Sequence, residues 1–314
     1  MSEEESNIEN KDSMEKAVEN VADEGGRVES SDNKSEDVKG SEDIKKVEKP
    51  VKETKKKDAD EDKHYIMDLK IKNRYLRTIV DAVGSLNKEM LIHIRPDGWK
   101  IKQVDPAHVG MVVIDLKNKL CEEYKADSFE IGLDLEKFDK LLKLAGMDVD
   151  VGLSYDSSMN VLWVTFDNLR RRLGLIDTVG MPDPKIPNFN NTAEVQLPAG
   201  EIMRGFKAAE LVADNFQFIA EKKQFKLYNE MDSELTDITW EKDVHEQLAR
   251  LNVSVKTRAI YSLDYAMGTL KVAHADSIIT MNYASDSPII LDYSFEDGGL
   301  ALKYLIAPRI ENQE

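Results

Sequence analysis

From residue 65 onward the chain alternates between two hydrophobic periods, one typical of strands and one typical of helices. Residues 65–71 alternate apolar and polar positions, which predicts a half-buried strand. The apolar residues of the next segment recur at helical spacing: Leu76, Ile79, Val80 and Val83. We therefore expect a helix that Asn73 caps at its start and that ends near residues 84–87.

The rest of the first half is predicted to be strands interrupted by one further helix. Pro96-Asp97-Gly98 is a turn sequence, so the runs on either side of it should pair as a hairpin. Strands are expected at 90–95, 99–104, 108–116, 129–133, 149–155, 161–166 and 169–175. The second helix is expected over 134–145, because its apolar residues again recur every three or four positions.

The second half repeats this order of elements. Strands are expected at 193–197, 216–220, 225–229, 235–240, 252–257, 278–283, 289–295 and 300–306, and helices at 198–213 and 263–272. Leu76 and Met203 are 127 residues apart, and Leu135 and Leu263 are 128 apart. Many strands with two helices per half favour a duplicated α+β fold, in which two similar domains each pack two helices on antiparallel sheets.

Between the two repeats lies a segment that should be an extended connector. Residues 177–192 hold three prolines, three asparagines and one glycine, which disfavour a helix. Four apolar side chains lie on it and should have something to bind: Val179, Met181, Ile186 and Phe189. The predicted domains are therefore 64–176 and 193–314, joined by 177–192.

Composition separates residues 1–63 from the rest. They hold 21 acidic and 13 basic residues and no Phe, Tyr or Trp, so we expect a disordered charged tail. Residues 64–314 carry 30 basic and 39 acidic residues, a net charge of −9, which argues against binding DNA by bulk charge. The one cysteine, Cys121, excludes an internal disulfide, and no apolar run is long enough to span a membrane. We predict an intracellular protein without a membrane partner.

A local concentration of basic residues on the predicted helices changes this picture. The set comprises Arg74, Arg77, Lys137, Lys140, Lys143, Arg204, Lys207 and Lys271. A solvated helix face explains any single member. All four helices of an acidic chain nevertheless carry such residues away from their apolar side, so a shared positive surface is expected if the helices lie on one side.

The sequence offers little that suggests catalysis. His108 has no second histidine or carboxylate at metal-ligand spacing, and Gly298-Gly299 suits a hairpin turn better than a phosphate loop. Arg170, Arg171 and Arg172 lie in one predicted strand, so Arg171 should face away from its two neighbours. We expect no catalytic residue, no metal and no cofactor.

Several motifs together resemble a known family. They are Asp105-Pro106-Ala107-His108-Val109, Lys143-Leu144-Ala145-Gly146, Val179-Gly180-Met181-Pro182 and Lys303-Tyr304-Leu305-Ile306-Ala307-Pro308-Arg309-Ile310-Glu311. Residues 65–311 are similar to the DNA polymerase sliding clamp, proliferating cell nuclear antigen. The short connector resembles that of archaeal members more than that of eukaryotic ones.

This resemblance implies a homotrimeric ring that encircles duplex DNA without reading its sequence and makes a polymerase processive. The helix-borne cations named above would face the DNA. Partners would be DNA polymerase, the clamp loader, ligase and flap nuclease, which dock through short peptides, and the compartment would be the archaeal cytoplasm and nucleoid or a eukaryotic nucleus.

The resemblance also assigns two surfaces, a groove for partner peptides and a subunit interface. The groove would comprise His108, Val109, Met111, Val179, Met181, Pro182, Pro288, Ala307, Pro308 and Arg309. The interface would comprise Leu169, Arg170, Arg171, Arg172 and Leu173 of one subunit against Leu235, Ile238 and Trp240 of the next. The chain departs from the family at Val104, Leu305 and Ile306, which bears on the preference for peptide anchors.

Two alternatives stay open from the sequence. A related checkpoint-type clamp subunit would assemble only with different chains and would be monomeric alone. An α+β enzyme would place its site between the repeats, where the residues available are mostly apolar.

Overall fold

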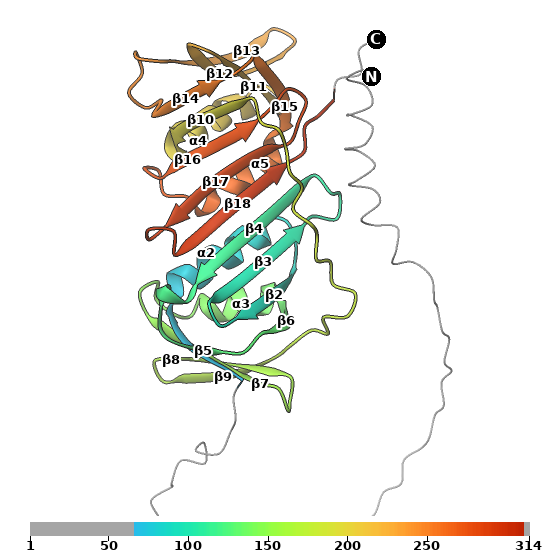
Figure 1. The fold of residues 1–314 in the computed structure, drawn as a ribbon, viewed down its shortest axis with the longest axis vertical. Coiled ribbons are helices and arrows are strands. Elements are labelled where there is room, and N and C mark those ends of the chain that lie inside the picture. Colours follow the sequence, from blue (N-terminus) through green and yellow to red (C-terminus); the bar gives the residue numbers. More distant parts are fainter. Residues whose placement is uncertain (1–65, 311–314) are drawn as a thin grey trace, which may run out of the picture. The chain divides into compact units, whose positions relative to one another are not determined.

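The alternating segment at the start of the globular region forms strand β1 (Met67–Lys72) in the computed structural model, which describes residues 66–310 (Figure 1). Its inward residues Met67, Leu69 and Ile71 are buried, as the alternation predicted. The predicted tail at 1–63 lies outside the described residues. Every β-pairing of the three sheets below is antiparallel.

The first sheet belongs entirely to the first repeat. Its order is β5 (Cys121–Ala126), β1, β7 (Asp150–Asp156), β8 (Val161–Phe166) and β9 (Leu169–Gly174). A separate sheet that belongs entirely to the second repeat has the order β13 (Glu234–Glu241), β12 (Gln224–Met231), β11 (Asn215–Glu221) and β15 (Thr257–Ser262). Within the described residues, β9 and β13 each have a strand on one side alone, so both are edge strands.

A nine-stranded sheet runs through both repeats. Its order is β14 (Arg250–Val253), β10 (Ala193–Pro198), β16 (Ile278–Tyr283), β17 (Ile289–Phe295), β18 (Leu300–Ile306), β4 (Gly110–Lys117), β3 (Gly98–Val104), β2 (Glu89–Arg95) and β6 (Phe129–Asp134). The repeats join where β18 pairs with β4, from Leu300 opposite Leu116 to Ile306 opposite Gly110. This pairing makes one continuous surface from two copies of the fold.

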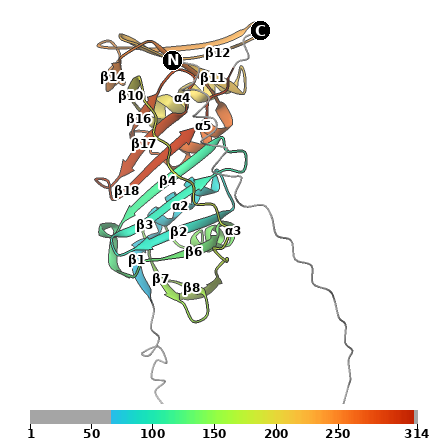
Figure 2. The same ribbon diagram turned by 45° about the vertical axis from the view of Figure 1, so that its right-hand side comes forward.

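The helices lie on one face of this sheet, behind it in Figure 1 and beside it in Figure 2. They are α2 (Asn73–Gly84), α3 (Leu135–Leu142), α4 (Ala199–Glu210) and α5 (Leu263–Thr269), with the short turns η1 (Asn118–Leu120) and η2 (Leu270–Val272). Helix α2 packs on α3, α4 packs on α5, and α2 meets η2 across the junction of the repeats. Their apolar faces join the sheets in one buried core.

Two predictions of local structure were wrong. Asn73 does not cap α2: it is the first helical residue, and its buried side-chain amide donates to the carbonyl oxygens of Leu142, Ala145 and Gly146 at 2.9–3.2 Å. It therefore satisfies the carbonyl groups at the end of α3. The strand predicted at 108–116 instead begins at Gly110, so His108 lies outside the observed strand.

Strands β5 and β15 were not predicted, and the strand expected at 252–257 is instead the end of β14 followed by the start of β15. Strand β5 is a largely exposed edge strand with Glu122, Glu123 and Lys125, so it has no buried face strong enough to show an alternation.

Candidate functional site

The face of the nine-stranded sheet that points away from the helices carries an unexpected apolar row. Strand β4 buries Val112, Ile114 and Leu116 against the helices, yet its opposite face also begins with the apolar residues Met111 and Val113. A strand with polar residues on its solvent side would not show this pattern. The outer face of β4 is therefore covered or able to bind something.

Cross-strand register aligns four of these outer residues. Ile290 lies opposite Leu305, Leu305 opposite Met111, and Met111 opposite Val104, across β17, β18, β4 and β3. With Val113 and the connector residue Phe189 they form a cluster separate from the main core, which we call the apolar patch. The patch spans both repeats and lies partly beneath the connector.

A buried carboxylate holds the loop between β3 and β4 in place. Asp105, which is 4 % exposed, accepts hydrogen bonds from the backbone N–H groups of Ala107 (2.9 Å), Val109 (2.8 Å) and Gly110 (2.6 Å). The hydroxyl of Tyr265 on α5 donates at 2.8 Å to Oδ2 of Asp105, the oxygen that also accepts from Ala107. Asp105 therefore ties a loop of the first repeat to a helix of the second, beside the apolar patch.

This junction is close-packed. A Cβ atom on Gly110 would lie 2.8 Å from the side chain of Leu86 and 2.9 Å from that of Tyr265, so the position requires glycine. Burial, with the hydrogen bond to Asp105 as a smaller cause, raises the pKa of Tyr265 to about 12, so its hydroxyl keeps the proton that it donates. His108 adopts a left-handed backbone with φ of 56° in the same loop and is exposed.

The structure brings some of the predicted groove residues together and separates others. Met111 belongs to the apolar patch, and the backbone N–H of Ala307 donates to the carbonyl of Val109 at 2.8 Å beside it. Pro288 and Pro308 are half-buried. Arg309 instead bonds to Asp214 at 3.2–3.3 Å, and its backbone N–H donates to the carbonyl of Ile260.

The first part of the connector lies over a different strand. The sulfur of Met181 lies 2.9 Å from where a Cβ of Gly132 on β6 would be, whereas Val179 is 86 % exposed and Pro182 is exposed. These three residues are therefore at the β6 end of the connector, and Phe189 is the connector residue that reaches the apolar patch.

Five residues of the apolar patch were absent from the predicted groove: Val104, Val113, Ile290, Leu305 and Phe189. The sequence connected Val104 and Leu305 with anchor preference alone. The signal was present in four of them: each lies on the outward face of a strand whose inward face is already apolar. Two apolar faces on one strand predict that both are covered. Phe189 had been noted only as an apolar residue of the connector.

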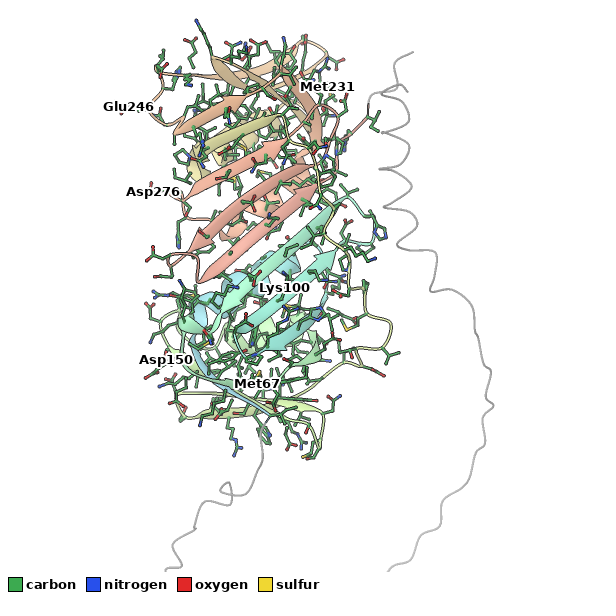
Figure 3. All side chains as sticks on the ribbon, viewed as in Figure 1. Met67, Lys100, Asp150, Met231, Glu246 and Asp276 are labelled. Carbon is green, nitrogen blue, oxygen red and sulfur yellow. The ribbon has the colours of Figure 1, made fainter. Side chains whose placement is uncertain are left out.

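Beside the patch, a hollow of about 480 Å³ lies between the sheet and the connector. Strands β2 and β3 supply His93, Arg95, Lys100 and Lys102, β6 supplies Glu130, and the connector supplies Asp183, Lys185 and Ile186. We call this the cationic hollow. Figure 3 marks Lys100 on β3.

Asp183 is the connector residue that binds inside the cationic hollow. Its carboxylate lies 2.5 Å from Nζ of Lys102 and 3.1 Å from Nε2 of His93, while Nδ1 of His93 lies 2.8 Å from Glu130. Burial by itself would raise the pKa of Asp183, but the bonds and charges of Lys102 and His93 outweigh it, so the pKa lies below its ordinary value.

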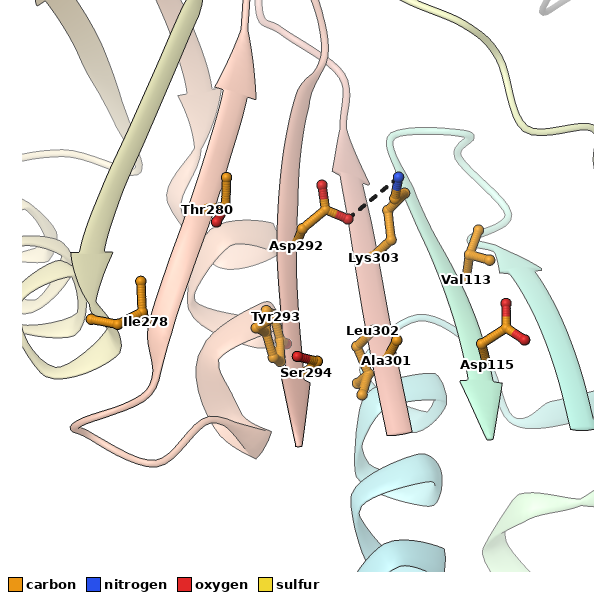
Figure 4. Close-up of a pocket in the computed structure, with 10 residues that line it drawn as sticks. All are labelled: Val113, Asp115, Ile278, Thr280, Asp292, Tyr293, Ser294, Ala301, Leu302 and Lys303. Atoms are coloured by element: carbon orange, nitrogen blue, oxygen red, sulfur yellow. Dashed lines mark ion pairs between the residues drawn. The ribbon is translucent and has the colours of Figure 1, made fainter. Parts of the chain in front are cut away.

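A second hollow of about 490 Å³ lies across β16, β17, β18 and β4 (Figure 4). Its charged residues are Asp115, Asp292 and Lys303, and Lys303 lies 3.4 Å from Asp292. Burial raises the pKa of Asp292 despite this lysine. The second hollow therefore has more acidic than basic side chains, the opposite of the cationic hollow.

The predicted DNA-facing cations all lie on or next to helical elements, and most are paired with a carboxylate close in sequence. Lys137 lies 2.8 Å from Asp134, Lys140 2.5 Å from Glu136, Lys143 2.5 Å from Asp139, and Arg204 2.7 Å from Glu201. Arg74 pairs with Asp148, and Arg77 with Asp139 at 3.7 Å. Lys207 and Lys271 are exposed and make no ion pair within residues 66–310.

The predicted interface strands β9 and β13 carry opposite charge. Arg170 and Arg172 both lie over the ring of Trp163, at 4.3 and 6.0 Å, so they share a face and Arg171 points to the other. Strand β13 carries Glu234, Asp237 and Glu241, with Leu235 and Ile238 between them. Leu173 and Trp240 are buried in the chain's own core, so their backbones alone could meet a neighbour.

Other kinds of site find no support in the described part of the chain. Residues 66–310 contain no group of three His, Cys, Asp or Glu side chains arranged to hold a metal ion. No helix in the same range is long and apolar enough to cross a membrane. Cys121 is half-buried, and burial raises the pKa of its thiol to about 12, so it is a poor nucleophile.

Comparisons with known proteins agree with this geometry. Residues 66–176 match the family model described as proliferating cell nuclear antigen, N-terminal domain. The chain is 31 % identical to the DNA polymerase sliding clamp of Methanosarcina mazei over 236 residues, which cover 74 % of this chain and 95 % of the relative. It is 29 % identical to the sliding clamp of Methanococcoides burtonii over 76 % of its own length and 96 % of that protein.

A solved structure of the A. fulgidus proliferating cell nuclear antigen, bound to the C-terminal region of FEN-1, is also similar. It matches with a TM-score of 0.74 and 26 % identity, over 79 % of this chain and all of that one. The duplicated α+β fold predicted from the two repeats is thereby confirmed. The chain belongs to the family of DNA polymerase sliding clamps.

Proposed function

We propose that three copies of this chain close into a ring around duplex DNA and carry replication enzymes along it. The observation that carries the proposal is the pair of edge strands: β9 rich in arginine and β13 rich in carboxylates, at opposite ends of the described unit in Figure 1. Because these strands of opposite charge lie at two different places on the chain, β9 of one copy can meet β13 of the next in a head-to-tail contact. Such contacts close into a ring when the rotation between neighbouring copies divides a full turn.

The helix face supplies the surface toward DNA. Cations on α2, α3, α4 and η2 would meet phosphates without reading bases, which suits a ring that slides. Because most of them already have carboxylate partners, contact with DNA is weak and the closed ring keeps the DNA in place.

The outer face supplies the docking site. We infer that DNA polymerase, the clamp loader, ligase and flap nuclease insert apolar anchors of short peptides at the apolar patch, which is on the face away from the helices. The FEN-1 peptide bound to the related A. fulgidus protein supports this inference. The chain itself would perform no reaction and hold no cofactor, and it would work where the chromosome is.

The boundaries that go with this proposal are repeats at 64–176 and 193–314 joined by the connector 177–192. The eight helix-borne cations, the ten groove residues and the β9 and β13 residues remain the proposed sites. The apolar patch residues Val104, Val113, Leu305, Ile290 and Phe189 are added to the groove.

Native mass and DNA retention test the proposal together. The full chain alone should have three times its 35.6 kDa mass. After loading on a nicked circular plasmid it should stay bound through a gel-filtration column, and a cut that linearises the plasmid should release it. Arg172→Glu should shift the mass toward the monomer, whereas Lys125→Gln on β5 should not. A chain that stays monomeric, or equal retention on both DNA forms, would contradict the ring.

A further inference from the structure

The cationic hollow has more positive charge than its contacts within the chain use. Arg95, Lys100, Lys102 and Lys185 line it against two carboxylates, Glu130 and Asp183, so these six groups carry a net +2. Lys100 also lies 3.7 Å from Asp115 at its rim. This surplus stands out on a chain whose net charge is −17. Such a concave site concentrates small anions.

The chain itself shows which anion suits the site. The Asp183 carboxylate reaches down from the connector and contacts both Lys102 and His93. Its side chain is 45 % exposed, whereas those of Lys102 and His93 are 17 % and 13 % exposed. The receiving groups are therefore largely buried in the sheet, and the carboxylate that binds them belongs to the more exposed connector.

The hollow continues directly into the apolar patch. Lys100, Lys102 and Val104 follow one another on the outward face of β3, so neighbouring members are about 7 Å apart. Lys102 also lies opposite Val113, a member of the patch. A peptide whose apolar anchors fill the patch would therefore reach Lys102 and Lys100 with the two or three residues next to those anchors.

We propose that the cationic hollow selects docking peptides with Asp or Glu beside their apolar anchors, and that the incoming carboxylate replaces Asp183 on Lys102 and His93. This proposal rests on the docking function proposed above and adds a charge preference to it. Exchange of one carboxylate for another costs little, because the cations keep a partner throughout. It also frees the middle of the connector to fold over the bound peptide.

The size of the charge surplus favours a carboxylate peptide over a nucleic acid. A net +2 matches one or two carboxylates, whereas a nucleic-acid strand would have to cross the acidic surroundings, including Asp115 and Glu130. The apolar patch next to the hollow offers nothing to phosphates but suits aliphatic and aromatic side chains.

Three kinds of synthetic peptide test the proposal on the full chain. They share one aliphatic and two aromatic anchors and differ in a flank of four Glu, four Gln or four Lys, placed on either side of the anchors in separate versions. Fluorescence anisotropy at physiological salt should show the Glu-flanked peptide binding about 10-fold tighter than the Gln-flanked one, and the Lys-flanked peptide weakest. The advantage should shrink at 0.5 M salt, because charge interactions are screened.

Matched variants locate the effect. Lys102→Gln should remove most of the Glu advantage and leave the affinity of the Gln-flanked peptide within about twofold. Lys125→Gln, an exposed lysine on β5, should change neither affinity. Asp183→Asn should strengthen binding of the Glu-flanked peptide about threefold because it removes the internal competitor, whereas Asp177→Asn at the start of the connector should not.

The outcomes separate this inference from the docking function. Equal affinity for all three peptides would overturn the charge preference and leave docking intact. Failure of every peptide to bind would overturn docking itself. If Lys102→Gln lowered the affinity for a short DNA duplex and left the Glu-flanked peptide unchanged, the hollow would be a nucleic-acid contact and the proposal would be wrong.

Discussion

The helix face and the outer sheet face both carry many basic residues, but they pair them differently. On the helices most of the basic residues meet a carboxylate close in sequence, as Lys140 meets Glu136 and Arg204 meets Glu201. On the sheet, Lys102 and His93 come from separate strands and meet a carboxylate from the connector. The first arrangement is local and repeated, and the second is built once from distant parts of the chain.

The difference teaches what each face can do. Exposed pairs at helical spacing contribute little to stability and exchange readily with phosphates, so we expect no single position on the helices to be essential. Groups that converge from several strands depend on the exact register of those strands. We therefore expect small, additive effects from changes on the helix face and large, position-specific effects on the outer face.

The largest effect should come from Asp105, on which the outer face depends. Asp105→Ala removes the acceptor of three backbone N–H groups and of the Tyr265 hydroxyl, so unfolding free energy should fall by about 3–5 kcal/mol. Tyr265→Phe should cost about 1 kcal/mol. Urea unfolding measures both. A loss below about 1 kcal/mol for Asp105→Ala would show that the outer face does not depend on this loop.

The next largest effect concerns docking. Met111→Glu places a charge in the centre of the apolar patch and should weaken binding of an anchor peptide about 100-fold or more, because burying an unpaired carboxylate is costly. Retention on circular DNA should be unchanged. Lys207→Gln is the matched change on the helix face and should leave peptide affinity unaltered. If Met111→Glu released the DNA and kept the peptide, the two faces would have to be reassigned.

Substitutions on the helix face should have smaller effects, which appear in how DNA affinity depends on salt concentration. Lys207→Gln should reduce the slope of log affinity for DNA against log salt by about 0.9, because one phosphate contact is lost. Glu136→Gln should tighten DNA binding about twofold at low salt, since Lys140 loses its competing carboxylate. Fluorescence titrations between 50 and 200 mM salt measure both. Loss of all DNA binding with Lys207→Gln would mean that the residues of the helix face do not contribute additively to DNA affinity.

The smallest effect is the pH response of the connector. The pKa of Asp183 is lower in the folded protein than its ordinary value of 3.8. Its contribution is therefore fully present well above pH 4 and is lost as the pH falls through the lower folded value. Amide hydrogen exchange over 181–186, corrected for intrinsic rates, should lose protection a few-fold below pH 4. Asp183→Asn should show the low protection at every pH, and a wild-type profile in this variant would show that the contact of Asp183 with Lys102 and His93 does not hold the connector.

Local patterns in the sequence were enough to find the two repeats, the hairpin at Pro96-Asp97-Gly98 and the positions of the helix-borne cations. Alternation in 161–166, 278–283 and 300–306 matched the observed strands residue for residue, because the buried face of a strand is recorded in its own sequence. The connector was recognised for a similar reason: three prolines in sixteen residues leave few other conformations.

The tertiary structure alone decided where those pieces meet. Alternation gives no register between strands, so nothing local places Met111 between Leu305 and Val104, or Asp183 on Lys102. Asn73 shows the same limit: an asparagine before a helix favours a cap, but here its amide binds the end of another helix. The sequence by itself determined which face of most elements is buried, since burial is recorded residue by residue. The docking surface came from pairing distant strands, which is a property of the folded chain.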